Sequence, residues 1–209
     1  MNEGDVANLM RVIDVQFRER AIFPVGLQRY WEYQWTLQTL REISATGQAH
    51  LRQVADIGCG DATLFTDLLA AHAPFSVYAC DPEPLPETAH PSIRFSQMSA
   101  EQFCSEVAPS LSLDAAVSVS VLEHCENRFA FCAALDTLPC PVLLTCEFCR
   151  DDSDMAHCLV PLSVLTRCIG EFKNHYLSRM ERCPVWAENS RNGEWYPLAM
   201  LFLPHEARR

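Results

Sequence analysis

The clearest chemistry in this sequence belongs to a short loop with two glycines. An apolar run at 54–57 ends in Gly58-Cys59-Gly60, and a helical pattern follows. Glycines in such a turn permit unusual backbone angles and let a ligand come close to the main chain. A turn of this kind between a strand and a helix is where a doubly wound sheet binds nucleotides. The loop therefore predicts a site for a nucleotide-like ligand.

Acidic residues around the loop discriminate between two kinds of nucleotide ligand. A dinucleotide needs Gly-x-Gly-x-x-Gly or Ala, with its pyrophosphate at the helix N-terminus. Thr63 stands at the third position of that pattern, and Asp61 would repel a phosphate. S-adenosylmethionine has no phosphate and carries a sulfonium and an ammonium group. The carboxylates of Asp56 and Asp61 suit that cation, so we expect S-adenosylmethionine as the cofactor.

Two segments resemble a known family. The stretch 56–62 resembles the first motif of class I S-adenosylmethionine-dependent methyltransferases, which usually reads Asp-x-Gly-x-Gly-x-Gly. Ala62 stands where the last glycine is usual, and alanine is the smallest replacement. The segment 113–124, which ends in Leu122-Glu123-His124, is similar to the fourth-strand segment of that family. The resemblance covers about residues 53–141 and implies a methyltransferase on a Rossmann-like fold.

The resemblance also implies which residues hold the cofactor. Asp81 lies about twenty residues past the loop, where an acidic group can accept hydrogen bonds from both ribose hydroxyls. We expect this carboxylate to face a cleft and to contribute little to stability. Ser99 stands where the family carries an acidic or polar residue against the adenine. The full set of expected cofactor-binding residues is Asp56, Gly58, Cys59, Gly60, Asp81, Pro82, Ser99, Ala100, Ser118 and Ser120.

Two further features point to the methyl acceptor. His124 follows the fourth expected strand, and an unperturbed histidine, with a pKa of about 6.5, can accept a proton at neutral pH. We expect it to be the general base if one is used, although it could equally be a packing histidine. The aromatic residues Tyr30, Trp31 and Tyr33 suit a lid over a ligand, or simply a helix packed on the core.

Strands and helices that alternate along the chain must position these residues. The pattern predicts an α/β fold: a Rossmann-like three-layer sandwich with a seven-stranded, mostly parallel sheet, two N-terminal helices and a C-terminal antiparallel hairpin turning at Asn192-Gly193. Four prolines in 82–91 predict that the helix after the second strand is short or absent. The expected strands are 54–57, 75–80, 93–95, 113–119, 141–146, 179–186 and 195–203, and the expected helices are 6–17, 28–44, 62–71, one from about 100, and 129–138.

Length and composition favour a single soluble domain. The 209 residues are enough for one sizeable core, and we expect one domain, with 1–50 as a helical cap and 51–209 as the core. The first twenty residues carry no apolar block of a secretory signal, and no late apolar run is long enough to cross a bilayer. We therefore expect a cytoplasmic protein with no membrane partner.

The net charge and the cysteines indicate which acceptor and which metal content to expect. The net charge of −11 makes a small-molecule acceptor more probable than RNA or a protein, because nucleic acid needs a basic surface. Cys146-x-x-Cys149 has the spacing of zinc ligands, and His157 and Cys158 follow it, but the second pair is not a clean Cys-x-x-Cys. We therefore expect packing cysteines and no metal. The alternative function is an inactive methyltransferase fold that serves as a binding or scaffold protein.

Overall fold

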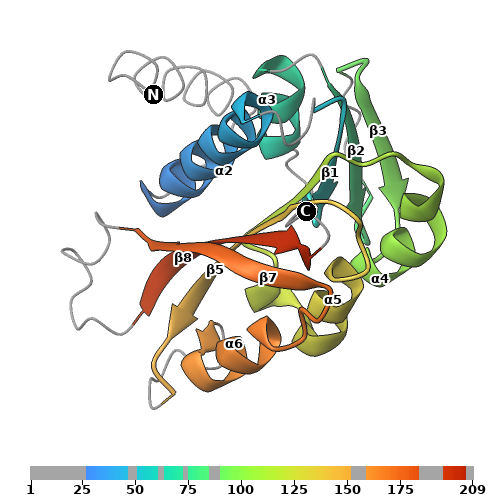
Figure 1. Ribbon diagram of the computed structural model, residues 1–209. Helices are drawn as coiled ribbons and strands as arrows, with labels where there is room; N and C mark the ends of the chain where they lie inside the picture. Colours follow the sequence, from blue (N-terminus) through green and yellow to red (C-terminus); the bar gives the residue numbers. More distant parts are fainter. Residues whose placement is uncertain are drawn as a thin grey trace.

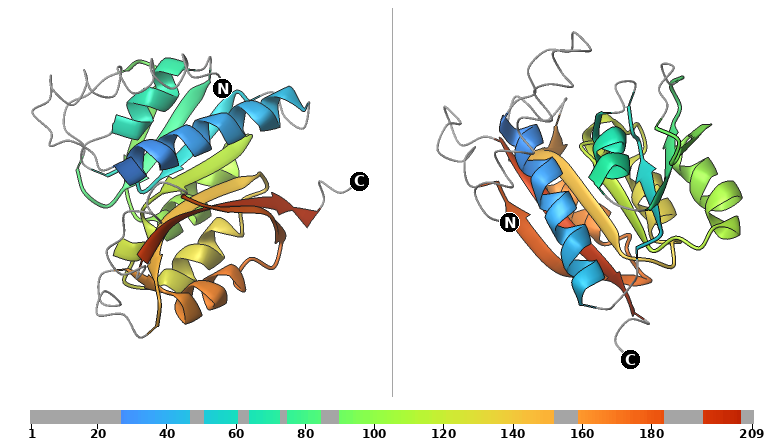
Figure 2. Two further views of the ribbon diagram at one scale, coloured as in Figure 1. Left: turned by 90° about the vertical axis from the view of Figure 1, so that its left-hand side faces the viewer. Right: turned by 90° about the horizontal axis from the view of Figure 1, so that it is seen from above.

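A mostly parallel sheet between two helical layers forms the body of the protein (Figures 1 and 2). The computed structural model describes residues 27–46, 51–60, 64–72, 75–84, 90–151, 159–183 and 195–205. The strands are β1 (Gln53–Ile57), β2 (Ser76–Asp81), β3 (Ile93–Gln97), β4 (Ala115–Val119), β5 (Val142–Cys149), β6 (Val160–Pro161), β7 (His175–Arg182) and β8 (Trp195–Pro204). The helices are α2 (Leu27–Ala45), α3 (Leu64–His72), α4 (Ala100–Gln102), α5 (Arg128–Leu135) and α6 (Leu162–Ile169).

The order of the strands places the glycine loop at a topological switch point. The sheet runs β3-β2-β1-β4-β5-β8-β7, with β6 paired to β5. Strands β1 to β6 pair in parallel, whereas β8 is antiparallel to both β5 and β7. The chain winds outward from β1 on one side and from β4 on the other. Ligands of such sheets bind at the carboxyl ends of the strands beside that reversal.

Side chains that alternate along the strands pack against the helices on both faces of the sheet. Successive side chains of a strand point to opposite faces. Val54 and Val117 therefore pack with α2 and α3, whereas Ala55, Ile57 and Ala116 pack with α5 and α6. Because both faces are covered, these strands carry near-continuous apolar sequence, as buried parallel strands do.

Helix α2 lies along one face of the sheet, against β4 and β8 (Figure 2). Leu37, Leu40 and Ile43 give it an apolar face in the core. Its far end is tied to β7, because Arg179 contacts Glu42 Oε2 at 2.8 Å and also donates to the Thr39 hydroxyl. The aromatic ring of Trp35 lies 5.2 Å from the Arg179 guanidinium. This helix is therefore fixed from both the core and the sheet edge.

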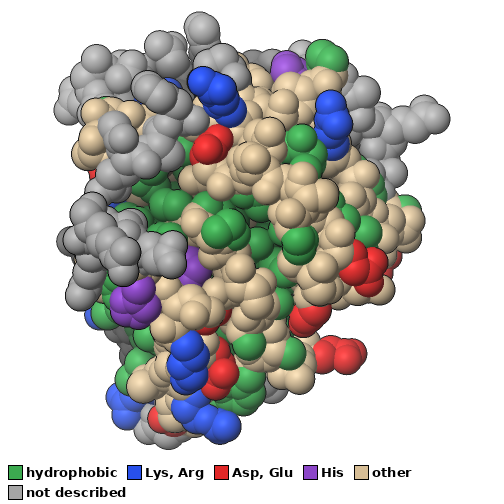
Figure 3. All heavy atoms as spheres, turned by 45° about the vertical axis from the view of Figure 1, so that its right-hand side comes forward, with side chains coloured by type: hydrophobic (Ala, Val, Ile, Leu, Met, Phe, Trp, Pro, Cys, Tyr) green, Lys and Arg blue, Asp and Glu red, His purple; other side chains and the backbone are tan. Residues whose placement is uncertain are grey.

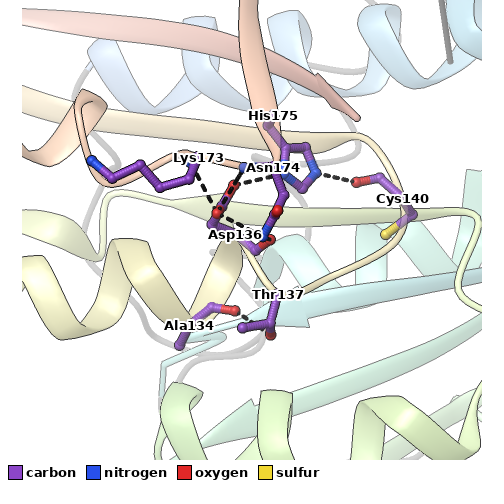
Figure 4. Close-up of polar contacts among 7 residues, drawn as sticks. All are labelled: Ala134, Asp136, Thr137, Cys140, Lys173, Asn174 and His175. Atoms are coloured by element: carbon purple, nitrogen blue, oxygen red, sulfur yellow. Dashed lines mark hydrogen bonds and ion pairs between the residues drawn. The ribbon is translucent and has the colours of Figure 1, made fainter. Parts of the chain in front are cut away.

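At the amino edge of the sheet, the carboxylate of Asp136 ties the end of α5 to the start of β7 (Figure 4). It accepts hydrogen bonds from the backbone amides of Lys173 and Asn174, each at 2.9 Å. Its Oδ1 lies 2.9 Å from Nδ1 of His175, a buried side chain whose Nε2 lies 3.0 Å from the Cys140 carbonyl. One side chain thus organises the crossover into the antiparallel strands.

The observed architecture confirms the predicted fold class, with three differences in detail. The sheet has an eighth strand, the two-residue β6, and helix α6 follows it; neither was expected. Strand β7 begins at His175 and ends at Arg182, four residues earlier at each end than 179–186. The expected helix 6–17 and the turn Asn192-Gly193 lie outside the described residues, as do residues 85–89 of the segment 82–91. The division of the chain at residue 50 stays a prediction.

The cysteines and helices of the described residues bear on the expectations about metal binding and the membrane. The ten cysteines there are free thiols, and most are buried. No group of three or more His, Cys, Asp or Glu side chains in that part of the chain is placed to hold a metal ion. None of the helices described combines the length and apolarity needed to cross a bilayer.

Candidate functional site

A cavity of about 370 Å³ opens at the carboxyl edge of β1, β2 and β4. It lies at the switch point, where the sequence placed the ligand. Its lining combines a glycine loop, two carboxylates and aromatic rings, with the first residues after β4 on the other side. The lining residues are Arg29, Tyr33, Asp56, Gly58, Cys59, Gly60, Phe65, Asp81, Val119, Ser120, Val121 and His124.

Backbone hydrogen bonds hold the glycine loop against the end of β2. The amides of Gly58 and Cys59 both donate to the Cys80 carbonyl, at 2.8 and 3.1 Å. Gly58 and Gly60 have φ angles of +77° and +71°, a region that side chains disfavour. A Cβ on Gly60 would meet no atom within 4 Å, so the space above this glycine is open to a ligand.

Gly58 and Gly60 differ in what an added methyl group would meet, which gives a matched test of the loop. A Cβ on Gly58 would lie 2.6 Å from both Cγ atoms of Val121, so Gly58→Ala combines a strained φ with a clash. We expect it to cost about 2–4 kcal/mol of unfolding free energy, and Gly60→Ala only about 1–2 kcal/mol. Urea unfolding measures both. Equal losses would show that contact with Val121 does not constrain the loop.

The two carboxylates of the cavity have different surroundings. Asp81 Oδ2 accepts from the Gly60 amide at 2.8 Å, and Oδ1 accepts from the Glu83 amide at 3.0 Å. Asp56 is buried and accepts from the Thr66 hydroxyl of α3 at 2.7 Å. Burial raises the pKa of Asp56 to about 7, although the hydrogen bond from Thr66 opposes the rise. A cation in the cavity would favour the ionised form of Asp56.

A glutamate from α2 reaches the end of β4. Glu32 is fully buried and accepts from the Ser120 hydroxyl at 2.7 Å, and Arg29 lies 3.2 Å from its other oxygen. Ser120 has a φ of +52°, rare for a residue with a side chain, while its amide donates to the Thr145 carbonyl. Burial raises the pKa of Glu32, and Arg29 opposes that rise. Strained residues held by their surroundings are typical of functional sites.

The turn after β4 separates two adjacent titratable residues. Leu122–His124 form a single 3₁₀ turn. The His124 side chain is exposed and lines the cavity, whereas Glu123 points inward and is only 7% exposed. Neither carboxylate oxygen of Glu123 has a hydrogen-bond partner among the described residues. Burial raises the pKa of Glu123 to about 8, and the nearby carboxylates of Glu32 and Glu147 add to the rise.

The structure brings together many of the residues that the sequence proposed. The expected residues that line the cavity are Asp56, Gly58, Cys59, Gly60, Asp81, Ser120, His124 and Tyr33. Tyr33 stacks on Phe65, with ring centroids 4.8 Å apart, so it is a wall of the site. Trp31 packs against the core on the face of α2 and α3. The side chain of Tyr30, like Asp61 and Ala62, lies outside the described residues.

Four expected cofactor residues lie outside the lining of the cavity. The Ser99 hydroxyl caps α4 by accepting from the Gln102 amide at 3.3 Å, and Ala100 is the first residue of that helix. Pro82 is exposed and offers its carbonyl to Gln97, and Ser118 is fully buried in β4. Their contact with a cofactor stays a prediction.

The sequence did not predict roles for Arg29, Glu32 and Glu123, because those roles depend on contacts between elements that are distant in the sequence.

A larger cavity, of about 680 Å³, lies at the opposite edge of the sheet. Asp136, Asn174 and His175 line it, but these side chains already bond to one another (Figure 4). The smaller cavity has the open glycine and the unpaired carboxylate close by. We therefore place the candidate site at the carboxyl edge.

Solved structures resemble this chain over most of its length. A methyltransferase from Aquifex aeolicus, described as SAM-dependent, is 11% identical and matches 80% of this chain and 88% of its own, with a TM-score of 0.55. The Haemonchus contortus phosphoethanolamine N-methyltransferase 2, in complex with S-adenosyl-L-methionine, is 10% identical over 74% of this chain and 49% of its own, with a TM-score of 0.58. The chain has the class I methyltransferase fold.

This fold hosts more than one kind of reaction. The cyclase SpnF is 11% identical over 74% of each chain, with a TM-score of 0.57. Fold alone does not determine activity, so function has to be argued from the site. No protein-family model and no curated protein matches the sequence.

Proposed function

We propose that this protein transfers a methyl group from S-adenosylmethionine to a small molecule. The glycine loop held by Asp81 is the observation that carries the proposal. Among the described residues, the carboxylates of Asp56 and Asp81 and one arginine, Arg29, line the cavity, and Arg29 is paired with Glu32. A pyrophosphate would meet these carboxylates, whereas the ammonium, sulfonium and ribose groups of S-adenosylmethionine are their natural partners.

The residues present fit this cofactor. The open space above Gly60 lets a ligand approach the main chain, and Asp81 has lone pairs left for ribose hydroxyls after accepting from two amides. When bound, the cofactor supplies a methyl group on a sulfonium, which is a good leaving group. The protein's task is then to align the acceptor and exclude water. His124, exposed at the mouth, is proposed to contact the acceptor.

Several observations support a small-molecule acceptor. The cavity is concave and bounded by Tyr33 and Phe65, as small-molecule sites are. The net charge is −11. On the face shown in Figure 3, the coloured basic side chains lie apart or beside acidic ones, without a continuous basic strip. A nucleic-acid acceptor would need such a strip to neutralise its phosphates.

Ligand binding tests the proposal directly. We expect calorimetry to detect binding of S-adenosylhomocysteine and no binding of NADH, because the carboxylates of the cavity would repel the pyrophosphate. Binding of NADH without S-adenosylhomocysteine would refute the proposed cofactor. Good binding of S-adenosylhomocysteine without methyl transfer to any acceptor would favour the alternative, an inactive fold that acts as a binding protein.

A further inference from the structure

Arg29 brings a positive charge into a cavity that the carboxylates of Asp56 and Asp81 also line. Although burial lowers the pKa of Arg29, the carboxylate of Glu32 raises it, and the net shift is upward. Arg29 is therefore charged at any physiological pH. The function proposed above gives ligand partners to the carboxylates of Asp56 and Asp81 but none to this cation.

One face of α2 presents Arg29 to the cavity. Arg29 and Tyr33 are four residues apart, a spacing that puts two side chains on the same side of a helix, and both line the cavity. The side chain of Arg29 is 27% exposed, whereas that of Glu32 is completely buried. The guanidinium is thus within reach of a ligand in the cavity, and Glu32 lies behind it.

Glu32 fixes the guanidinium and leaves part of it unoccupied. Nη1 of Arg29 donates to Glu32 Oε2 at 3.2 Å, and Glu32 Oε1 accepts from the Ser120 hydroxyl at 2.7 Å. The arginine is therefore anchored, through Glu32, to the end of β4. A guanidinium has five N–H donors. Within the described part of the chain Arg29 donates only to Glu32, so Nε and Nη2 are left for a ligand.

The amino-acid end of the proposed cofactor carries charges of both signs. S-adenosylmethionine has an ammonium and a carboxylate on the same carbon, in addition to its sulfonium. Asp56 and Asp81 would attract the cationic groups and repel the carboxylate, whereas Arg29 can donate charge-assisted hydrogen bonds to it. One arginine paired with Glu32 suits a single carboxylate that lies beside its own ammonium. It does not offset the two charges of a pyrophosphate.

We propose that Arg29 binds the carboxylate of the cofactor's amino-acid end, and that Glu32 is the positioning residue that holds the guanidinium there; this rests on the function proposed above. Because the guanidinium is anchored before the ligand arrives, little side-chain freedom is lost on binding. The contact makes the site selective for the carboxylated cofactor over its decarboxylated form, which keeps the sulfonium and the ammonium.

Two ligands that differ only in the carboxylate test the inference. Decarboxylated S-adenosylhomocysteine keeps the adenosine, the sulfur and the ammonium of S-adenosylhomocysteine and lacks only the carboxylate. We expect calorimetry on the wild-type protein to show that S-adenosylhomocysteine binds at least about tenfold more tightly, since its carboxylate gains charge-assisted hydrogen bonds.

Variants of Arg29 assign this preference to its guanidinium. Arg29→Gln keeps a long polar side chain without the charge. It should reduce the affinity for S-adenosylhomocysteine about tenfold without weakening the binding of the decarboxylated ligand, so that the preference disappears. Arg29→Lys keeps the charge without the planar fork and should retain part of the preference. Arg41→Gln removes the same charge from an exposed position farther along α2 and should leave both affinities unchanged.

Glu32→Asp tests the positioning role. This variant keeps the charge but is one methylene shorter, so its carboxylate cannot reach both Ser120 and Arg29. It should reduce the preference for the carboxylated ligand. A general loss of stability would not do so, because it would affect both ligands alike.

The outcomes separate the inference from the proposed function. Equal affinity of the wild type for the two ligands would overturn the inference without any variant. A preference that survives Arg29→Gln would overturn it too, because the carboxylate would then be held elsewhere in the site. A preference unchanged by Glu32→Asp would refute the positioning role of Glu32. Failure of the wild type to bind S-adenosylhomocysteine would instead refute the proposed function.

Discussion

Replacing Asp81 with alanine should weaken S-adenosylhomocysteine binding by about 1.5–3 kcal/mol for each charge-assisted hydrogen bond that is lost. Two ribose hydroxyls are the proposed donors. The carboxylate also accepts from the amides of Gly60 and Glu83. The variant should therefore lose stability without ligand as well, by about 1–3 kcal/mol for the amides left unpaired. This corrects the expectation from sequence that the carboxylate contributes little to the free protein.

Asp114 provides the control for Asp81. Its Oδ2 accepts from the amides of Arg52 and Gln53, at 2.6 and 2.9 Å, at the other end of β1. Asp114→Ala should thus lower the melting temperature while the dissociation constant for S-adenosylhomocysteine stays unchanged. Calorimetry and thermal unfolding on the same preparations separate the two effects. If Asp81→Ala changed only stability, Asp81 would be a structural anchor and not a cofactor ligand.

Strands β1 and β4 were predictable because both are short and mostly apolar. Apolar residues at 54–57 and 115–119 are buried on both faces, as the sequence indicated. Gly58 and Gly60 were readable because few residues other than glycine adopt their backbone angles. Local chemistry dictated these features, and so a single sequence was enough.

Helix α6 could not be read in the same way. It has only two turns, and Pro161 precedes it without a side-chain cap. Its buried residues, Leu165 and Cys168, make a stripe too short to stand out from the surrounding apolar sequence. The short helix depends on packing against α5 for its stability. Tertiary contacts of this kind leave little trace in local sequence.

The contacts of Ser120 and of the turn 122–124 were the least predictable part of the candidate site. Ser120 and Glu32 are 88 positions apart, and their hydrogen bond exists only because α2 crosses the end of β4. In the turn 122–124, sequence reasoning favoured His124, since histidine titrates near neutral pH. Yet the fold buries Glu123 and leaves His124 exposed. Which of two neighbours faces inward is decided by the turn's orientation on the sheet, and burial then brings the pKa of the carboxyl group near neutrality.

The largest loss of stability is expected from Asp136→Ala, at the amino edge of the sheet. Removal of this carboxylate leaves the amides of Lys173 and Asn174 without their acceptor and takes away the partner of His175 Nδ1 (Figure 4). Each donor left without its acceptor inside the protein costs about 1–3 kcal/mol, so the loss of all three contacts should cost about 3–5 kcal/mol. Urea unfolding should show a loss of this size. In the variant, amide exchange should accelerate most in the antiparallel strands β7 and β8, because Asp136 anchors their connection to α5.

Thr137 and the cofactor site provide the two controls. Thr137 is adjacent, exposed, and donates only to the Ala134 carbonyl, at 2.7 Å, so Thr137→Ala should cost less than about 1 kcal/mol. Folded Asp136→Ala protein should still bind S-adenosylhomocysteine with the wild-type dissociation constant, since the network lies at the edge opposite Gly58 and Asp81. If Asp136→Ala unfolded at the same urea concentration as the wild type, the network would contribute little to stability. Loss of cofactor affinity in the folded variant would mean that the two edges of the sheet are coupled, which the separate hydrogen-bond networks argue against.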